Sequence, residues 1–408
     1  MKIMALTGNE AAAEAMRQIN PDVVAAYPIT PQTELMHKFA EFVADGLVDT
    51  EMVLVESEHS ALSATVGASA AGARAMTATS AQGLALMWEI LYIAAGLRLP
   101  IVMPVINRAL SAPINIHGDH SDTMGARDSG WIQIFSENSQ EVYDNTIIAI
   151  RIAEHPDILL PVMITMDGFI ISHTMERVEV LDDDVVKSFI GEYNPSYKLL
   201  DIKNPITVGP LDLQDYYFEH KRAQAEAMEN AYKLIKEIDE EYSKISGRRY
   251  KYVEPYEIDD AEIVLISLGS TAGTIKEVID ELRLKGMKVG GLKIRVYRPF
   301  PREEIKEFLS NALVVGVMDR SIAFGATCGP VCLDIKATLQ GTKLSNLPIV
   351  DYIYGLGGRD ITPRDIEKIF GELERIKILG EVPNLPRYIG VRGEEDYPEI
   401  RSKFKIKN

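Results

Sequence analysis

The sequence predicts an α/β protein with mainly parallel sheets and helices on both faces, and three observations support this fold class. Short apolar runs alternate with helical patterns over roughly the first 170 residues, as they do in doubly wound sheets. A second α/β alternation begins near Asp260. The chain has 408 residues, of which 46% are hydrophobic and 25% are charged, and this suits two or three globular domains.

Apolar runs in the first unit are predicted to be strands. They cover residues 22–27, 52–57, 73–80, 99–107 and 159–168. Helical patterns separate them, beginning with an Ala-rich segment at the N-terminus and continuing over residues 30–46, 59–72, 83–97 and 139–155. Tiny residues dominate the helix over 59–72, where Gly67 and Gly72 would let another backbone or a ligand approach closely.

A long connection leads to the second unit. Between Glu176 and Leu213 the periodicity decays into acidic and Pro-containing connectors, and residues 222–245 then form a charged amphipathic helix. This helix is expected to pack between domains, with a partner-binding helix as the alternative. Beyond it, strands are predicted over residues 261–270, 288–301, 313–319 and 348–358, and helices over residues 274–286, 302–312 and 362–370.

We therefore expect three parts in the chain. A first domain with its connector helix covers residues 1–245, and a second α/β domain covers residues 255–380. Residues 381–408 are rich in Pro and charge without periodicity, which predicts an extended C-terminal arm that lies on a partner.

Charge and hydropathy argue against two classes of partner. A net charge of −17 disfavours binding to a nucleic-acid backbone, which requires clustered Lys and Arg. Charged residues and prolines interrupt the most apolar stretch, at Glu89, Arg98, Pro100 and Pro104. That stretch therefore predicts helix, turn and buried strand rather than a membrane span. The N-terminus lacks a signal-peptide pattern, and a cytoplasmic location is expected.

The chain contains two cysteines, Cys328 and Cys332, in the motif CGPVC. Two are too few for a disulfide scaffold, and too few for an iron–sulfur cluster or a structural zinc site held by this chain alone. We expect both to be buried structural thiols near a helix start. Any electron carriers that the protein uses must then lie on other chains.

Two predicted strand ends carry unusual polar residues. Thr30 precedes Pro31, which suits the first helical position with Thr30 as the N-cap, and such a helix start also suits a bound carboxylate. Glu58, with Glu56 and His59 beside it, stands between a strand and a helix of tiny residues. A carboxylate there either stabilises the helix N-terminus, lies at a surface turn, or engages a cofactor ring nitrogen.

A third predicted strand ends in Asn107 and Arg108. An arginine at this place is either a surface or salt-bridge residue, or the fork that binds a substrate carboxylate. The loop that follows holds His117, Asp119, His120 and Asp122. Without helical spacing or a second cluster, these residues do not predict a metal site. Together the three strand ends predict a site for a small anionic ligand beside a carboxylate.

Several segments have distinctive sequences. In the first unit these are YPITPQTE, VESEHSALSATVGASAAGARAMTATS, NRALSAP and RDSGWIQIFSENSQEVYDN. In the second unit they are KIRVYRPFPREEI, VMDRSIAFG and YIYGLGGRDIT. In these segments the chain resembles the alpha subunit of the 2-oxoacid:ferredoxin oxidoreductases, most of all the pyruvate type (pyruvate synthase). The resemblance spans nearly the whole chain. It implies two α/β domains. The first is a doubly wound parallel-sheet domain of the thiamine-diphosphate-binding type, which binds the aminopyrimidine ring of the cofactor. The second is a transketolase C-terminal-like α/β domain.

The resemblance also implies roles for individual residues. Glu58 matches the glutamate that hydrogen-bonds the pyrimidine nitrogen of thiamine diphosphate, which favours the tautomer that removes the thiazolium C2 proton. Arg108 matches the arginine that pairs with the substrate carboxylate, and Thr30 matches a hydroxyl that helps to hold the same carboxylate. The resemblance assigns no more than nearness to the site to Glu56, His59, Gln82 and the loop over residues 117–122.

The implied reaction is the oxidative decarboxylation of pyruvate with coenzyme A to acetyl-CoA and CO₂, with reduction of ferredoxin, and it is reversible. The diphosphate and Mg²⁺ are expected on a beta subunit, and [4Fe-4S] clusters on beta and on a small ferredoxin-like subunit, in a complex with gamma and delta chains. Alternatives are 2-oxoisovalerate, 2-oxoglutarate or oxalate as substrate, or a non-catalytic α/β binding subunit. The absence of an added basic residue between Ala109 and Ile116 disfavours 2-oxoglutarate, and Thr30 disfavours oxalate.

Overall fold

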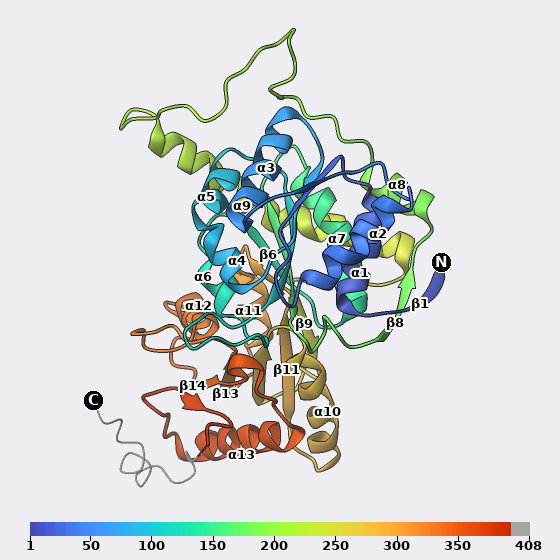
Figure 1. Ribbon diagram of the computed structural model, residues 1–408. Coiled ribbons are helices and arrows are strands. Elements are labelled where there is room, and N and C mark those ends of the chain that lie inside the picture. The colour runs from blue at the N-terminus through green and yellow to red at the C-terminus, as the bar shows by residue number, and fades with distance from the viewer. Residues whose placement is uncertain (393–408) are drawn as a thin grey trace, which may run out of the picture. The chain divides into compact units, whose positions relative to one another are not determined.

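The computed structural model of the chain describes residues 1–392 and contains two compact units (Figure 1). The first unit comprises residues 1–254, 268–270 and 294–301. The second unit comprises residues 255–267, 271–293 and those from 302 onward. The chain therefore crosses between the units more than once, which a division into consecutive segments does not anticipate.

A seven-stranded sheet forms the centre of the first unit. Its strands, in spatial order, are β12 (Val296–Arg298), β6 (Ile132–Phe135), β7 (Val162–Asp167), β5 (Val102–Asn107), β4 (Ala75–Met76), β2 (Val23–Ala26) and β3 (Glu51–Leu54). All neighbours are parallel except β12 and β6. Every residue of β5 and β7 is buried, which explains why both sequences are continuous apolar runs. The predicted mainly parallel α/β class is confirmed.

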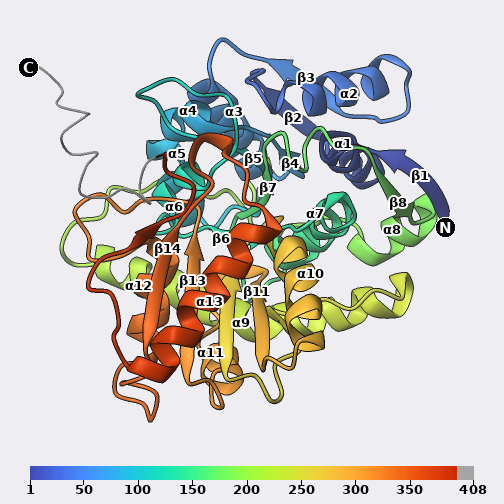
Figure 2. The ribbon, with the colours of Figure 1, turned by 90° about the horizontal axis from the view of Figure 1, so that it is seen from below.

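Helices cover both faces of this sheet. On one side α1 (Gly8–Ile19) packs against α7 (Ser139–Ala153), and α7 contacts β5 and β7 (Figure 2). On the other side lie α3 (Glu58–Ala71), α4 (Ala81–Leu86) and α5 (Trp88–Gly96), whose apolar residues share one buried cluster with β5 and Trp131. The shorter helices of this unit are α2 (Thr33–Ala44), α6 (Ser121–Gly125) and α8 (Asp183–Ile190).

Two features of the first unit differ from the prediction. The N-terminus begins with a strand, β1 (Lys2–Leu6), and not directly with the Ala-rich helix. This strand pairs antiparallel with β8 (Glu176–Val180), which lies in a segment predicted to be an irregular connector. Because most of β1 is exposed, its short run lacks the apolar pattern of a buried strand.

The segment from Gly191 to Tyr216 is the long irregular connection that leads into helix α9, and Figure 1 shows it extending away from the helices of the first unit. The helix α9 (Tyr217–Ser246) buries Ala231, Ile235 and Ile238 and contacts α5 and α7. These contacts agree with a charged helix that covers its own unit.

Arg295 joins a late segment of the chain to the first unit. Its guanidinium is fully buried, forms an ion pair with Asp239 on α9, and donates from Nη1 to Asn145 Oδ1 at 2.7 Å. The following strand, β12, adds to the edge of the first sheet. The single strand predicted over residues 288–301 is therefore wrong, because this stretch forms two strands in different sheets.

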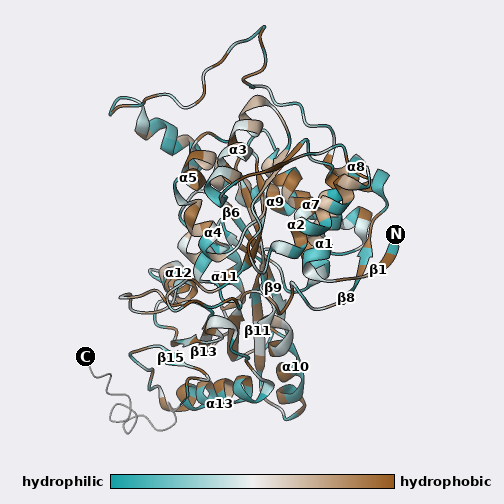
Figure 3. Ribbon diagram, viewed as in Figure 1, coloured by the Kyte–Doolittle hydropathy of each residue, from teal (hydrophilic) through white to brown (hydrophobic). Residues whose placement is uncertain are grey.

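A six-stranded sheet forms the centre of the second unit. Its spatial order is β15 (Arg387–Tyr388), β14 (Ile349–Ile353), β13 (Val314–Asp319), β10 (Ile263–Ser267), β11 (Val289–Ile294) and β9 (Val253–Tyr256). The helices α10 (Thr271–Leu284) and α13 (Pro363–Leu379) pack together on one face (Figure 2), and α11 (Arg302–Phe308) contacts α12 (Pro330–Leu339), which lies against β13 and β14. A 3₁₀ turn, η1, covers Leu356–Gly358. Figure 3 shows hydrophobic and hydrophilic residues alternating along α13, whose apolar side reaches the core.

The described part of the predicted C-terminal arm contains a short strand. Arg387 and Tyr388 form the strand β15 at the edge of the second sheet, where they pair with Tyr352 and Ile353 of β14. Residues 393–408 lie outside the described residues. Among the helices that the structure describes, none combines the length and the apolar character that a bilayer crossing requires.

Candidate active site

The three polar strand ends follow neighbouring parallel strands. β5, β4, β2 and β3 are adjacent and parallel, so the chain leaves all of them at the same edge of the sheet. Thr30 follows β2, Glu58 follows β3, and Arg108 directly follows β5. The order of the strands therefore gathers the three residues at one sheet edge.

Thr30 has a different local role from the predicted one. The helix α2 starts at Thr33 with Gln32 as its N-cap residue, so Thr30 is not the cap and Pro31 is not the first helical residue. Gln32 is fully buried and donates from Nε2 to the carbonyl of Ala78 at 2.9 Å. The side chain of Thr30 is exposed, and its carbonyl accepts a hydrogen bond from Arg108 Nη1 at 2.9 Å.

The guanidinium of Arg108 is held in place by backbone oxygens. Besides the bond to Thr30, its Nε donates to the carbonyl of Asn115 at 2.8 Å. Arg108 is 7% exposed, and burial lowers the pKa of its guanidinium. No residue within 1–392 accepts a hydrogen bond from Nη2. A fixed, partly desolvated arginine with an unused N–H pair is suited to an anionic ligand.

Asp122 fixes the backbone from which Arg108 projects. Its Oδ2 accepts from the N–H of Arg108 at 2.9 Å and from the N–H of Ala81 at 3.1 Å. Its Oδ1 accepts from Asn107 Nδ2 at 2.9 Å and from the N–H of Thr123 at 2.7 Å. Burial raises the pKa of Asp122 to about 6, so several donors are needed to keep it ionised. This carboxylate ties the end of β5 to the start of α4.

Glu58 is the first residue of α3, and the Ser57 side chain caps this helix. Glu58 is 7% exposed, whereas Glu56 is exposed and accepts a hydrogen bond from Ser60. No described residue donates a hydrogen bond to the Glu58 carboxylate. This carboxylate can therefore accept a hydrogen bond from a ligand.

Gly83 of α4 lies directly against Glu58. A Cβ atom at this position would lie 2.8 Å from Glu58 Cγ, 2.9 Å from its Oε1 and 2.4 Å from Thr79 Oγ1. Since Thr79 is fully buried, it has little room to move aside. Because Gly83 has no side chain, the Glu58 side chain can occupy the space beside it.

Replacing Gly83 with alanine is expected to lower the activity of the assembled protein by on the order of 10- to 100-fold, because the added methyl displaces the Glu58 carboxylate. Gly67→Ala is the matched control, since Gly67 lies in α3 and a Cβ there would meet no atom within 4 Å. Both variants are compared by turnover and by thermal unfolding. Equal activity of the two variants would contradict the role of Gly83.

The remaining residues that the sequence places near the site have structural partners. His59 Nε2 lies 3.7 Å from Glu89 Oε2, and Gln82 Nε2 donates to Ser111 Oγ at 2.9 Å. His120 is buried, with Nε2 2.6 Å from Asp167 Oδ1. The loop over residues 117–122 therefore contributes its buried Asp122 and His120 to the packing of this sheet edge.

Family models match both units. Residues 14–240 match the model described as pyruvate flavodoxin/ferredoxin oxidoreductase, thiamine diphosphate-binding, and residues 261–366 match pyruvate:ferredoxin oxidoreductase core domain II. The chain belongs to the pyruvate:ferredoxin oxidoreductase family. The resemblance stated from the motifs is thereby confirmed.

Relatives in this family match along nearly the whole chain. The chain is 58% identical to pyruvate synthase subunit PorA of Thermotoga maritima, over 95% of this chain and 98% of that protein. It is 50% identical to the subunit of the same name from Methanocaldococcus jannaschii, over 92% and 95% of the two chains. It is also 45% identical to ketoisovalerate oxidoreductase subunit VorA of Pyrococcus horikoshii, again over 92% and 95%.

A solved structure of a more distant oxidoreductase has the same fold. It is a 2-oxoglutarate:ferredoxin oxidoreductase from Magnetococcus marinus, with a TM-score of 0.71 at 20% identity. The match covers 91% of this chain and 65% of that chain. At this identity the likeness extends to the fold, which is the thiamine-diphosphate-binding type predicted for pyruvate:ferredoxin oxidoreductases.

Proposed function

We propose that this chain is the alpha subunit of a pyruvate:ferredoxin oxidoreductase, which oxidatively decarboxylates pyruvate with coenzyme A and reduces ferredoxin. The observation that carries this proposal is the agreement among relatives: six proteins named pyruvate synthase subunit PorA are 48–58% identical over 92–95% of this chain. The arrangement of Glu58, Arg108 and Thr30 at one sheet edge supports the same reaction.

The residues around Glu58 fit the aminopyrimidine of thiamine diphosphate. The Glu58 carboxylate can accept a hydrogen bond from a ligand, and the ring nitrogen of the cofactor, once protonated, is a suitable donor. When bound, thiamine diphosphate supplies the carbon nucleophile and the electron sink for decarboxylation. Glu58 would hold the proton at the pyrimidine nitrogen, and Gly83 leaves the space for its side chain.

Arg108 would bind the carboxylate of the 2-oxoacid. The two N–H groups of its Nη2 remain available, because Nε and Nη1 are already held by the carbonyls of Asn115 and Thr30. The exposed hydroxyl of Thr30 would add a third donor to the same carboxylate. Asp122 keeps Arg108 in place through its backbone, so we class it as a positioning residue.

The reaction requires groups that we assign to other subunits. With two cysteines, this chain cannot bind a [4Fe-4S] cluster by four cysteine ligands, so the clusters and Mg²⁺ are assigned to beta and to a ferredoxin-like subunit in a complex with gamma and delta chains. A set of exposed apolar side chains on helices that contact α3 supports a partner on this side. It consists of exposed side chains on α4 and α5: Leu86, Trp88, Tyr92 and Ile93.

The test is anaerobic co-expression of this chain with its candidate beta, gamma and delta subunits, followed by a screen of 2-oxoacids for CoA-dependent reduction of a viologen dye. Pyruvate is expected to give the highest kcat/KM. A relative named ketoisovalerate oxidoreductase is 45% identical, so 2-oxoisovalerate is the most informative competitor. A preference for 2-oxoisovalerate would contradict the pyruvate assignment, and reduction without any 2-oxoacid dependence would contradict the whole proposal.

A further inference from the structure

Two thiols and a carboxylate meet at the start of α12 in the second unit. Cys328 precedes the N-cap residue Gly329, and Cys332 lies in the first turn of the helix. Asp351 comes from the neighbouring strand β14. The two Sγ atoms and a carboxylate oxygen of Asp351 all lie within 4.8 Å of one another, and all three residues are buried. The predicted burial of both thiols near a helix start is confirmed.

Two carboxylates accept backbone hydrogen bonds at the start of α12. Asp351 Oδ2 accepts from the N–H of Gly329 at 2.6 Å, and Asp319 Oδ2 accepts from the N–H of Cys332 at 3.0 Å. The other oxygen of Asp351 is buried and accepts no hydrogen bond from an N–H or hydroxyl group of residues 1–392, and the Asp319 carboxyl group lies beside Asp351. A buried carboxylate oxygen beside two thiols is therefore available to a ligand.

The electrostatics of the cluster favour a cation. Two buried carboxyl groups lie beside the thiols: Asp351 is within 4.8 Å of both sulfurs, and Asp319 accepts from the N–H of Cys332. Lys336, one helical turn after Cys332, is close enough for its charge to act on Asp351. When a metal ion binds, the two thiols lose their protons, and the cation takes over the positive charge that leaves with them. A divalent cation would supply the missing positive charge without needing a proton on each group.

We propose that Cys328, Cys332 and Asp351 form a binding site for a thiophilic divalent cation of the Zn²⁺ type, with a fourth position open to water. Zn²⁺ binds thiolates at about 2.3 Å and carboxylates at about 2.0–2.2 Å, so two sulfurs of a tetrahedral site are roughly 3.8 Å apart. The ligand atoms of the three residues lie within 4.8 Å of one another, a limit that is compatible with these values. Two cysteines alone are too few for such a site, and Asp351 is the third ligand that only the fold reveals.

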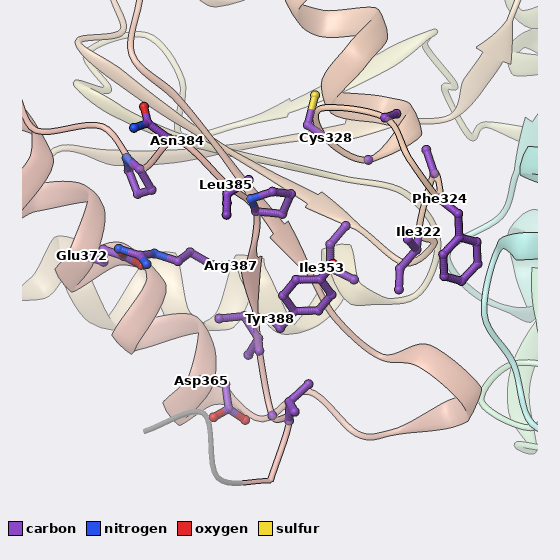
Figure 4. Close-up of a pocket in the computed structure, with 18 of the residues that line it drawn as sticks. Ile322, Phe324, Cys328, Ile353, Asp365, Glu372, Asn384, Leu385, Arg387 and Tyr388 are labelled. Carbon is purple, nitrogen blue, oxygen red and sulfur yellow. The ribbon is translucent and has the colours of Figure 1, made fainter. Parts of the chain in front are cut away.

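The proposed site lies next to a cavity. Cys328 and Gly329 lie on the wall of a cavity of about 1190 Å³ in the second unit. Figure 4 shows the Cys328 sulfur directed away from the labelled apolar side chains of this cavity. The Cys328 thiol is thus buried, and the cavity reaches the backbone beside it.

The test uses the full-length chain, purified with a reductant, stripped with a chelator and then incubated with Zn²⁺ or Co²⁺. We expect one Zn²⁺ per chain by elemental analysis. We also expect Co²⁺ to produce a thiolate-to-metal charge-transfer band and the visible bands of a tetrahedral site. Since the chain contains no other cysteine, such a band must come from Cys328 and Cys332.

Cys328→Ser, Cys332→Ser and Asp351→Asn are each expected to weaken Zn²⁺ binding by on the order of 10-fold or more. Asp360→Asn is the matched control, because Asp360 is an exposed carboxylate of the same unit. The absence of a cobalt–thiolate band would overturn the site, as would unchanged Zn²⁺ binding in the cysteine variants or conversion of the two thiols to a disulfide that binds no metal. None of these measurements depends on turnover, so the site and the proposed enzymatic function can fail independently.

Discussion

Replacing Glu58 with glutamine is expected to lower the turnover of the assembled complex by at least about 100-fold while leaving the fold intact. The amide has nearly the same shape as the carboxylate and fits the same space against Gly83. It carries no negative charge, however, so it cannot stabilise a proton on the pyrimidine nitrogen. The loss should therefore fall on kcat, measured as CoA-dependent reduction of a viologen dye by pyruvate.

Glu56→Gln provides the matched control for this variant. Glu56 is two residues away in the same turn, but it is exposed and hydrogen-bonds Ser60. Its replacement should leave turnover within about twofold of the unmodified protein, as is usual for an exposed side chain. Both complexes should elute at the same size and show the same subunit content. Full activity of Glu58→Gln, or an equal loss in the two variants, would remove Glu58 from the mechanism.

Replacing Arg108 with alanine is expected to lower kcat/KM for pyruvate by on the order of 30- to 4,000-fold, because losing one partner of a buried charge pair costs about 2–5 kcal/mol. Most of this loss should be a higher KM, since the contact to the carboxylate is made before and during the reaction. Arg108→Lys restores the positive charge but not the planar guanidinium that can donate two parallel hydrogen bonds, so it should recover only part of the lost kcat/KM.

Arg108 also holds the carbonyls of Thr30 and Asn115, so its removal could act by loosening the sheet edge. Thermal unfolding of the Arg108 variants measures this contribution separately. Arg177→Ala is the control for a general loss of positive charge, because the Arg177 side chain is 63% exposed. An Arg108→Ala complex with unchanged kcat/KM would exclude a carboxylate contact at this residue.

The fold could be predicted from the sequence wherever a strand is buried on both faces. The strands β5 and β7 are continuous apolar runs because helices cover both of their faces. β1 was not predictable in this way, since most of its residues are exposed and its partner β8 lies more than a hundred residues later. β12 has three residues, and its pairing with β6 is set by the tertiary fold rather than by local pattern.

The candidate site could be predicted in part for the same reason. Arg108 directly follows β5, Glu58 lies in the turn after β3, and parallel strands bring their ends to one edge. The contribution of Asp122 depends on how a loop of more than ten residues returns to β5, and no local pattern encodes that return. Gly83 reads as an ordinary helical residue until the fold places Glu58 against it. The predicted capping role of Thr30 was wrong because α2 begins three residues later.

The burial of Arg295 has a consequence for dividing this protein into parts. The partners of its guanidinium, Asp239 and Asn145, belong to a stretch of chain that ends well before it. A polypeptide cut after Glu254 would keep the buried Asp239 carboxylate but lose its counterion, Arg295. The strand β6 would also lose the neighbouring strand β12. The N-terminal half is consequently not an autonomous module, and the later residues must be synthesised before it can be completed.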